Sequence, residues 1–187
     1  MLQCQSIIIL MMSLFFHILN QRIVKKVKKI KVVLTDVDGV LTDGGMFYTK
    51  DGDAIKKFHA RDGMGISLLR KNKIPTIIVT KESTLMVKAW AKKMHVAKLY
   101  DGIKQKEEII ELVCSEFKVT SKELAYIGDD VNDIGLLSRV GFSAVPNDAI
   151  SSNKKIVDYV CKTDGGKGVL REIADLLLIS QELNANY

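Results

Sequence analysis

Two aspartates one residue apart follow an apolar stretch early in the chain. Asp36 and Asp38 come directly after the β-branched run at residues 32–34 and just before Gly39. Such a run is typical of a central parallel strand, whose carboxyl end binds ligands in open α/β sheets. Two carboxylates on one face of a strand repel each other unless a cation or a shared proton compensates them. Because Mg²⁺ commonly bridges carboxylates to phosphate, the pair predicts a phosphate-handling site; a strand closed by an Asp-Gly turn is the alternative.

Further polar groups follow other predicted strands, and each alone has an ordinary structural explanation. Thr80 could be a strand-end hydroxyl, and Lys106 could be a solvated charge on a helix. Asp129 and Asp130 could form a turn or a helix N-cap. Parallel strands bring their carboxyl ends to one crevice, so together these groups could surround one phosphate. The predicted set is Asp36, Asp38, Thr80, Lys106, Asp129 and Asp133.

Apolar runs alternate with amphipathic stretches along the rest of the chain. This alternation predicts an α/β fold: a Rossmann-like, doubly wound, mostly parallel sheet with helices on both faces. Asp51-Gly52 lies between apolar segments at 46–48 and 54–58 and predicts a small β-hairpin flap at about residues 45–58. Ser83 is the expected N-cap of its helix. We expect strands at 76–80, 97–100, 124–128, 142–145 and 157–160, and helices at 62–73, 83–94, 104–117, 131–139 and 169–178.

Length, charge and cysteine content exclude several classes of protein. The 187 residues, 47% of them hydrophobic, suit one domain with a sizeable core. The net charge of +6 comes from basic residues at positions 22–31, and the rest of the chain is neutral. The sequence therefore lacks the broad basic face that nucleic-acid binding needs. Cys4, Cys114 and Cys161 are odd in number and widely spaced, which indicates neither a disulfide framework nor a zinc site and favours a reducing cytoplasm.

Residues 1–28 are interpreted as an N-terminal extension, followed by a domain at about 29–180 and a tail at 181–187. The apolar residues 7–19 are too few for a clear membrane span and lack the basic start and cleavage site of a signal peptide. A weak membrane anchor with a basic cytoplasmic flank is one interpretation. We favour a start codon assigned too far upstream, and we expect a cytoplasmic protein.

Four short motifs, in chain order, resemble those of the haloacid dehalogenase (HAD) superfamily of phosphotransferases. Residues 36–42, DVDGVLT, match the first motif, Thr80 the second, Lys106 the third and residues 128–133, GDDVND, the fourth. The stretches at 43–48, 61–66 and 165–172 resemble a small subgroup without a large cap domain. That subgroup dephosphorylates 3-deoxy-octulosonate (KDO) 8-phosphate or nine-carbon ulosonate 9-phosphates. The resemblance covers about residues 29–180 and implies a Mg²⁺-dependent phosphatase that acts on a sugar phosphate.

The resemblance also implies a division of labour between the two aspartates. Asp36 would attack phosphorus to form an aspartyl-phosphate, and Asp38 would protonate the leaving sugar oxygen and then deprotonate the hydrolytic water. Mg²⁺ would be held by Asp36, by the backbone carbonyl of Asp38 and by Asp129. Thr80 and Lys106 would hold the phosphoryl oxygens. Asp130 and Asp133 would orient the metal site and Lys106.

The second motif departs from the pattern of the eight-carbon enzymes. Those enzymes usually carry Thr/Ser-Gly-Arg here, whereas this chain has Thr80-Lys81-Glu82. The resemblance implies that Glu82, paired with Lys93 one helix further on, goes with nine-carbon acids such as KDN or N-acetylneuraminate 9-phosphate. Charges that complement the dipole of the intervening helix are the alternative explanation for both residues. We favour a nine-carbon substrate.

The hairpin and a glycine-rich segment near the end of the chain indicate contacts with other copies. The hairpin carries apolar residues that would be exposed unless something covers them, and the resembling subgroup forms a tetramer through its hairpins. Gly165, Gly166 and Gly168 would form a flexible strip near an adjacent active site, where Lys167 or Arg171 could meet a substrate carboxylate. An ordinary helix entry with a solvated face is the alternative.

A second class of function uses similar residues. Bacterial receiver domains signal through a phosphorylated Asp, but their acidic pair comes first and the acceptor stands alone on a later strand. Here the expected acceptor, Asp36, comes first, and Asp38 follows two residues on, ready for proton transfer. This order favours an enzyme over a signalling or non-catalytic phospho-acceptor on the same fold.

Overall fold

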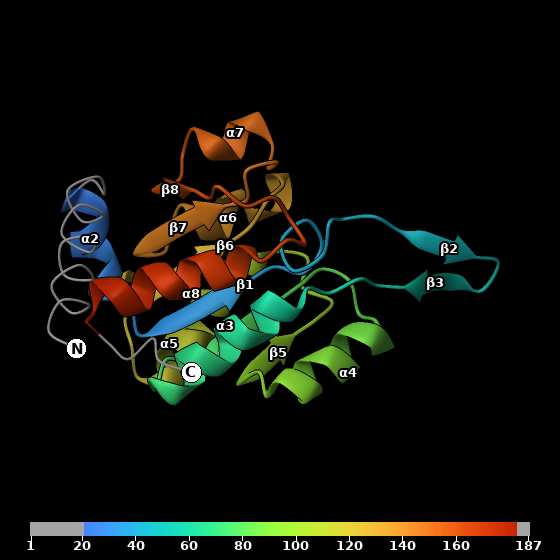
Figure 1. The fold of residues 1–187 in the computed structure, drawn as a ribbon, viewed down its shortest axis with the longest axis horizontal. Coiled ribbons are helices and arrows are strands. Elements are labelled where there is room, and N and C mark those ends of the chain that lie inside the picture. The colour runs from blue at the N-terminus through green and yellow to red at the C-terminus, as the bar shows by residue number, and fades with distance from the viewer. Residues whose placement is uncertain (1–20, 183–187) are drawn as a thin grey trace, which may run out of the picture.

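A six-stranded parallel sheet forms the centre of the fold in the computed structural model, which describes residues 21–182 (Figure 1). β1 lies inside the sheet and pairs in parallel with β4 on one side and β6 on the other. This arrangement confirms the predicted α/β fold with a mostly parallel sheet. In spatial order the strands are β5 (Lys98–Tyr100), β4 (Thr76–Val79), β1 (Val32–Thr35), β6 (Leu124–Ile127), β7 (Phe142–Val145) and β8 (Tyr159–Val160).

Two separate apolar cores cover the two faces of this sheet. Val33 belongs to one core, whereas its neighbours Val32 and Leu34 belong to the other, as the alternation of side chains along a strand requires. All three side chains are buried, which explains why residues 32–34 are apolar without alternation. The first core contains residues of α2 (Gln21–Val27), α3 (Ala60–Lys71), α4 (Leu85–Met94) and α8 (Val169–Ser180), and the second contains residues of α5 (Ile109–Phe117) and α6 (Ile134–Leu137).

The hairpin projects away from the sheet as a narrow arm (Figure 1). It consists of β2 (Phe47–Thr49) and β3 (Gly52–Ile55), which pair antiparallel. The predicted second segment, 54–58, is partly wrong: the strand ends at Ile55, and Phe58 stacks on Trp90 of α4 with ring centroids 4.5 Å apart. The turn lies one residue earlier than predicted, because Thr49 pairs with Gly52.

Several helix boundaries differ from the sequence predictions for local reasons. Thr84, and not Ser83, caps α4 by accepting a hydrogen bond from the backbone N–H of Val87, while Ser83 donates to Asp101. The helix expected at 131–139 is divided into a 3₁₀ turn and the short α6, and a short helix that was not predicted follows β7. That 3₁₀ turn is η3 (Val131–Asp133), and the short helix is α7 (Ser151–Lys154). Two further 3₁₀ turns, η1 (Lys106–Glu108) and η2 (Ser121–Glu123), precede α5 and β6.

Part of the expected N-terminal extension belongs to the packed structure. Val27 at the end of α2 is fully buried in the first core, and Ile23 packs against that core. Gln181 donates hydrogen bonds from Nε2 to the backbone oxygens of Val27 and Ile30, which joins the two ends of the described chain. The apolar residues 7–19 lie outside the described residues. Within residues 21–182, no helix has the length and hydrophobicity needed to cross a bilayer.

A buried carboxyl group joins α3 to the start of α8. Asp62 is fully buried in the first turn of α3, and its Oδ1 accepts a hydrogen bond of 3.1 Å from the backbone N–H of Arg171. Its Oδ2 has no hydrogen-bond partner among the described residues. Burial raises the pKa of Asp62 to about 7, although hydrogen bonds from the backbone of Arg171 and Leu170 act in the opposite direction.

Replacing Asp62 by Asn should therefore stabilise the protein more at pH 8 than at pH 5. The folded-state pKa of about 7 lies above the ordinary aspartate value of 3.8, so the folded state holds the Asp62 proton more tightly. Ionisation of wild-type Asp62 then lowers the free energy of unfolding as the pH rises from about 4 to 7, by about 2–4 kcal/mol in total. Asn cannot ionise and keeps an oxygen for the Arg171 N–H. Melting curves of both proteins at the two pH values test this, and an equal difference at both would contradict it.

Candidate active site

The carboxyl ends of β1, β4 and β6 surround a cavity of about 310 Å³. Asp36 and Asp38 follow β1, Thr80 follows β4, and Asp129 and Asp130 follow β6. Parallel pairing places these ends at the same edge of the sheet, as the sequence analysis predicted. The lining residues are Asp36, Asp38, Gly39, Gly44, Met46, Thr80, Lys81, Glu82, Asp129, Asp130 and Asn132.

A buried lysine connects the first aspartate to the fourth motif. Lys106 is fully buried at the start of η1, and its Nζ lies 2.6 Å from Asp36 Oδ2 and 2.7 Å from Asp133 Oδ1. Burial would lower the pKa of Lys106, but the charges of Asp36 and Asp133 outweigh that effect and raise it. Lys106 is therefore a fixed cation at the floor of the site.

Both carboxylate oxygens of Asp133 have partners within the protein. Its Oδ1 contacts Lys106 and accepts a hydrogen bond from the Tyr126 hydroxyl, while its Oδ2 accepts from the backbone N–H groups of Asp129 and Asp130 at 2.8 and 3.2 Å. A carboxylate held in this way has little capacity left for a ligand. Asp133 instead holds the turn that carries Asp129.

Negative charge accumulates around this lysine. Oxygen atoms of Asp36, Asp129 and Asp133 lie within 4.8 Å of one another, and Lys106 supplies one positive charge against three carboxylates. Burial, followed by the charge of Asp133, raises the pKa of Asp36 to about 7. Burial, followed by the charge of Asp36, raises the pKa of Asp129 to about 8. A divalent cation bound by oxygen atoms would remove this repulsion, so the donor set fits Mg²⁺.

Glycine is required where the first motif passes the fourth. Gly39 has φ +80°, and a Cβ atom there would lie 1.9 Å from Asp129 Oδ2. Any larger residue would displace the carboxylate from its place beside Asp36. The first and fourth motifs therefore pass each other closely at Gly39.

Asp38 lies apart from the buried lysine and has its own partners. The Thr42 hydroxyl donates a hydrogen bond of 3.1 Å to Asp38 Oδ1, and Lys56 Nζ lies 2.6 Å from the same oxygen. Asp38 has 27% of its side chain exposed, whereas the side chain of Asp36 is 6% exposed. The two carboxylates of the first motif therefore have different surroundings, as different chemical roles require.

Not all of the residues expected to determine substrate specificity line this cavity. Glu82 lines it, next to Thr80 and Lys81. Lys93 lies exposed in the last turn of α4 and is not part of the cavity wall in the single chain. The structure thus brings Glu82 but not Lys93 to the cavity that Asp36 and Asp38 line.

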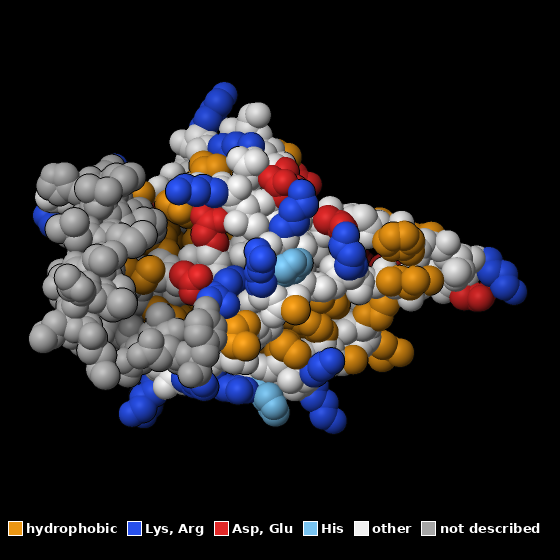
Figure 2. Space-filling model, in the orientation of Figure 1, with side chains coloured by type: hydrophobic (Ala, Val, Ile, Leu, Met, Phe, Trp, Pro, Cys, Tyr) orange, Lys and Arg blue, Asp and Glu red, His pale blue; other side chains and the backbone are white. Residues whose placement is uncertain are grey.

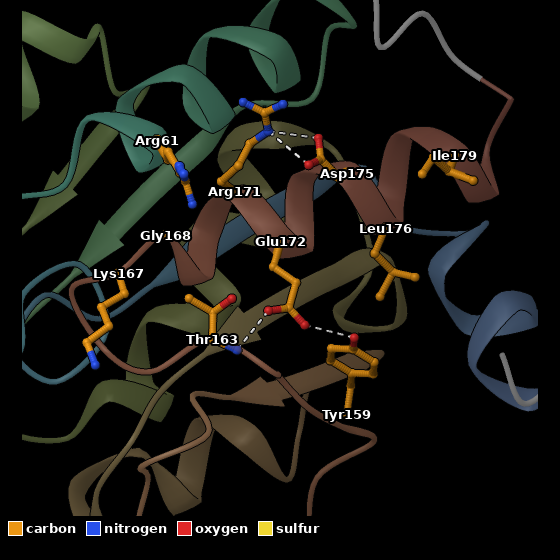
Figure 3. A pocket seen from close by; sticks show the side chains of 10 residues that line it. All are labelled: Arg61, Tyr159, Thr163, Lys167, Gly168, Arg171, Glu172, Asp175, Leu176 and Ile179. Atoms are coloured by element: carbon orange, nitrogen blue, oxygen red, sulfur yellow. Dashed lines mark hydrogen bonds and ion pairs between the residues drawn. The ribbon is translucent and has the colours of Figure 1, made fainter. Parts of the chain in front are cut away.

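Lys167 and Arg171 border a second hollow of about 550 Å³, which runs along α8 and is also lined by Tyr159 of β8 and Arg61 of α3 (Figure 3). Arg171 Nε contacts both oxygens of Asp175 at 2.8 and 2.9 Å, and Lys167 Nζ lies 2.8 Å from Asp164. Both cations already have acidic partners. Within one chain they lie outside the wall of the catalytic cavity.

Two residues of the site were missed by the sequence analysis. Tyr126 lies in the apolar strand β6, where its hydroxyl reaches Asp133 and Lys106. Lys56 follows the hairpin, where it resembles any surface lysine in the sequence. A tyrosine in a fully buried strand is a weak signal, because its hydroxyl needs a partner. No local pattern distinguishes Lys56 from Lys57.

Comparisons with known proteins agree with this geometry. The model of the haloacid dehalogenase-like hydrolase family matches residues 69–173. The 3-deoxy-D-manno-octulosonate 8-phosphate phosphatase of Haemophilus influenzae is 37% identical over 157 residues, which cover 84% of this chain and 87% of that protein. The corresponding phosphatase of Escherichia coli K12 is 31% identical over 159 residues and covers 85% of each chain.

Solved structures of such phosphatases have the same fold. The cobalt-bound form of the Haemophilus influenzae enzyme superimposes with a TM-score of 0.82 and covers 84% of this chain and 92% of that one. The Moraxella catarrhalis enzyme, solved with a magnesium ion, a phosphate ion and a KDO molecule, has a TM-score of 0.82 at 31% identity, with coverage of 86% and 92%. Together with the acidic cavity, these matches show that the chain belongs to the haloacid dehalogenase-like hydrolases and is a phosphoric monoester hydrolase.

Proposed function

We propose that this protein hydrolyses the phosphate ester of a 3-deoxy-ulosonate through an aspartyl-phosphate on Asp36. The observation that carries the proposal is the pair of differently held carboxylates in one cavity. Asp36 contacts the buried Lys106, whereas Asp38 is more exposed and contacts Thr42 and Lys56. One carboxylate is thus suited to attack phosphorus and the other to transfer protons.

In the first step an oxygen of Asp36 forms a bond to phosphorus while the bond from phosphorus to the sugar oxygen breaks. Asp38 donates its proton to that sugar oxygen, so the sugar leaves as a neutral alcohol and Asp38 becomes a carboxylate. Thr80 and Lys106 hold the phosphoryl oxygens, since Thr80 lines the cavity and Lys106 contacts Asp36.

In the second step Asp38 accepts a proton from water, and the water oxygen attacks the phosphorus of the aspartyl-phosphate. The bond between phosphorus and Asp36 breaks, which releases inorganic phosphate and returns Asp38 to its protonated form. Dividing one difficult displacement into two easier ones is the general advantage of a covalent intermediate.

Mg²⁺ would be held by Asp36, by the backbone carbonyl of Asp38 and by Asp129. Asp133 is not included, because both its oxygens are occupied by protein groups. When bound, the ion neutralises negative charge on the carboxylates and the phosphoryl group. Asp133 and Asp130 orient the turn that carries Asp129, since the Asp130 carboxylate accepts a hydrogen bond from the Val131 N–H.

KDO 8-phosphate is the first candidate substrate, because relatives at 37% and 31% identity are phosphatases of that compound. Glu82 favours a second candidate, a nine-carbon ulosonate such as KDN or N-acetylneuraminate 9-phosphate. Its carboxylate lines the catalytic cavity next to Thr80, where it could accept hydrogen bonds from the hydroxyls of a longer sugar. Lys93 contributes to this choice only if assembly brings it to a neighbouring site.

A homotetramer joined through the hairpins would complete the site. The hairpin exposes Met46, Phe47, Tyr48 and Ile55, each with more than half of its surface accessible. On the face shown in Figure 2, hydrophobic side chains gather over this arm and the adjoining part of the body. Such a patch is typical of an interface. In that assembly Lys167 or Arg171 of one copy could meet the carboxylate of a substrate bound by another.

Mg²⁺ should raise the melting temperature of the wild type and have little effect on Asp129→Asn. At about a hundred times its Kd the ion adds about 2.7 kcal/mol to the free energy of unfolding. Without metal, the variant should be at least as stable as the wild type, because it removes a repelled carboxylate. Asp130→Asn, which keeps an acceptor for the Val131 N–H, is the matched control and should retain the shift. An undiminished shift in Asp129→Asn would contradict this ligand set.

Wild-type protein should release phosphate from 3-deoxy-ulosonate phosphates at least about tenfold faster, in kcat/KM, than from hexose phosphates. Asp36→Asn should lower turnover more than about a thousandfold without changing the circular dichroism spectrum. The ratio of kcat/KM for KDO 8-phosphate and the nine-carbon esters decides between the two candidates. Preference for a hexose phosphate would contradict the substrate class, and residual Asp36→Asn turnover within tenfold of wild type would contradict the mechanism.

Changing Phe47 and Tyr48 together to Glu should reduce the molar mass measured by light scattering during gel filtration. Both side chains are exposed in the single chain, so the substitutions should leave its melting temperature nearly unchanged while burying charge in any hairpin interface. Lys50→Glu at the hairpin turn is the control. A wild type that is already monomeric at micromolar concentration would contradict the tetramer.

A further inference from the structure

A buried lysine at the base of the hairpin contacts the expected acid and base of the reaction. Lys56 follows β3, and its side chain is only 3% exposed. Its Nζ lies 2.6 Å from Asp38 Oδ1 and 3.8 Å from Asp53 Oδ2. An ammonium group is buried only where opposite charges compensate for its lost hydration. Lys56 is therefore held in place by the two carboxylates, one from the catalytic loop and one from the hairpin.

Two side chains hold Asp38, and both contact the same oxygen atom. The Thr42 hydroxyl and the Lys56 ammonium each contact Oδ1, and no contact within the described residues goes to Oδ2. Rotation of a carboxylate about its last bond has no sharp preference of its own. Two donors on one oxygen therefore decide where the other oxygen lies. Since Asp38 lines the catalytic cavity, Oδ2 is the oxygen that remains for proton exchange with a ligand there.

We propose that Lys56 is a positioning residue of the phosphatase reaction: with Thr42 it holds Oδ1 of Asp38, so that Oδ2 meets the leaving sugar oxygen and later the water. The inference rests on the proposed function, in which Asp38 transfers both protons. Lys56 itself does not contact the phosphoryl group; it acts through the orientation of the Asp38 carboxylate.

This role makes the hairpin part of the catalytic apparatus. Asp53 lies in β3 and shares Lys56 with Asp38, so the position of the arm influences the position of the proton-transferring carboxylate. Lys57, the next residue, provides the contrast. Its Nζ pairs with Asp43 at 2.5 Å, but its side chain is 65% exposed and water can replace that contact.

The test compares Lys56→Met with the matched control Lys57→Met on two esters. In single-turnover experiments with excess Mg²⁺-loaded enzyme, the release of the leaving group reports the first chemical step. The first ester is an alkyl phosphate, namely the sugar phosphate that the wild type hydrolyses fastest. Its leaving oxygen needs a proton from Asp38. The p-nitrophenolate of p-nitrophenyl phosphate leaves as a stable anion and needs none.

Lys56→Met should slow release from the sugar phosphate by about tenfold to a hundredfold and release from p-nitrophenyl phosphate by less than about threefold. In steady-state assays on the sugar phosphate, the loss should appear in kcat with little change in KM. Lys56→Arg, which keeps a cation, should recover part of the lost rate. Lys57→Met should behave as wild type on both esters. If Lys56→Met does not fold, Lys56→Gln, which keeps a polar end but is too short to reach Asp38, replaces it with the same expectations.

An equal loss on both esters would show that Lys56 supports folding or phosphate binding, and it would overturn the positioning role. No loss on the sugar phosphate would overturn it as well. Both results leave the proposed function intact, because the wild type remains active. A wild type that hydrolyses p-nitrophenyl phosphate and alkyl phosphates but no 3-deoxy-ulosonate ester would instead contradict the proposed substrate. The comparison for Lys56 would then be made on the best alkyl ester and would stay decisive.

Discussion

A lysine ammonium buried between two carboxylates is the interaction on which the rest of the site depends. Lys106 is fully buried, with Asp36 on one side and Asp133 on the other. Removing an ammonium from water is costly unless opposite charges surround it. Lys106 begins η1, Asp36 directly follows β1 and Asp133 ends η3. Compensation of the lysine's charge therefore requires three separate parts of the chain to close around one point. This closure sets the shape of the catalytic edge.

The same interaction leaves the site short of positive charge. One ammonium faces three carboxylates, and burial, together with the repulsion between these carboxylates, raises the pKa values of Asp36 and Asp129 to about 7 and 8. The fold holds these groups together through backbone N–H donors to Asp133 and through a glycine at position 39, where a side chain would collide with Asp129. A divalent cation bound here would relieve the repulsion between the carboxylates and would in turn attract a phosphate.

Sequence patterns predicted most of the fold and the centre of the site for one reason. Parallel strands align their carboxyl ends, so polar residues that follow Val32–Thr35, Thr76–Val79 and Leu124–Ile127 must converge whatever the loops do. Predictions that needed a particular side-chain direction were weaker. Ser83 and Thr84 are both good caps, but in the folded chain Thr84 caps α4 while Ser83 donates to the distant Asp101. The family resemblance implied that Lys93 is a partner of Glu82, but Lys93 lies outside the cavity of the single chain.

By itself, the sequence determined the chemistry that this protein can perform: two carboxylates two residues apart at the end of a buried strand, with a lysine and further aspartates after later strands. These properties follow from residue type and from the period of a β-strand, which are local. Only the tertiary structure decided which partner each group has. Tyr126 reaches Asp133 across 7 residues and Lys56 meets Asp38 across 18, whereas Lys106 meets Asp36 from a distant part of the sequence. Burial forces charged and polar groups to find partners wherever the packed chain supplies them.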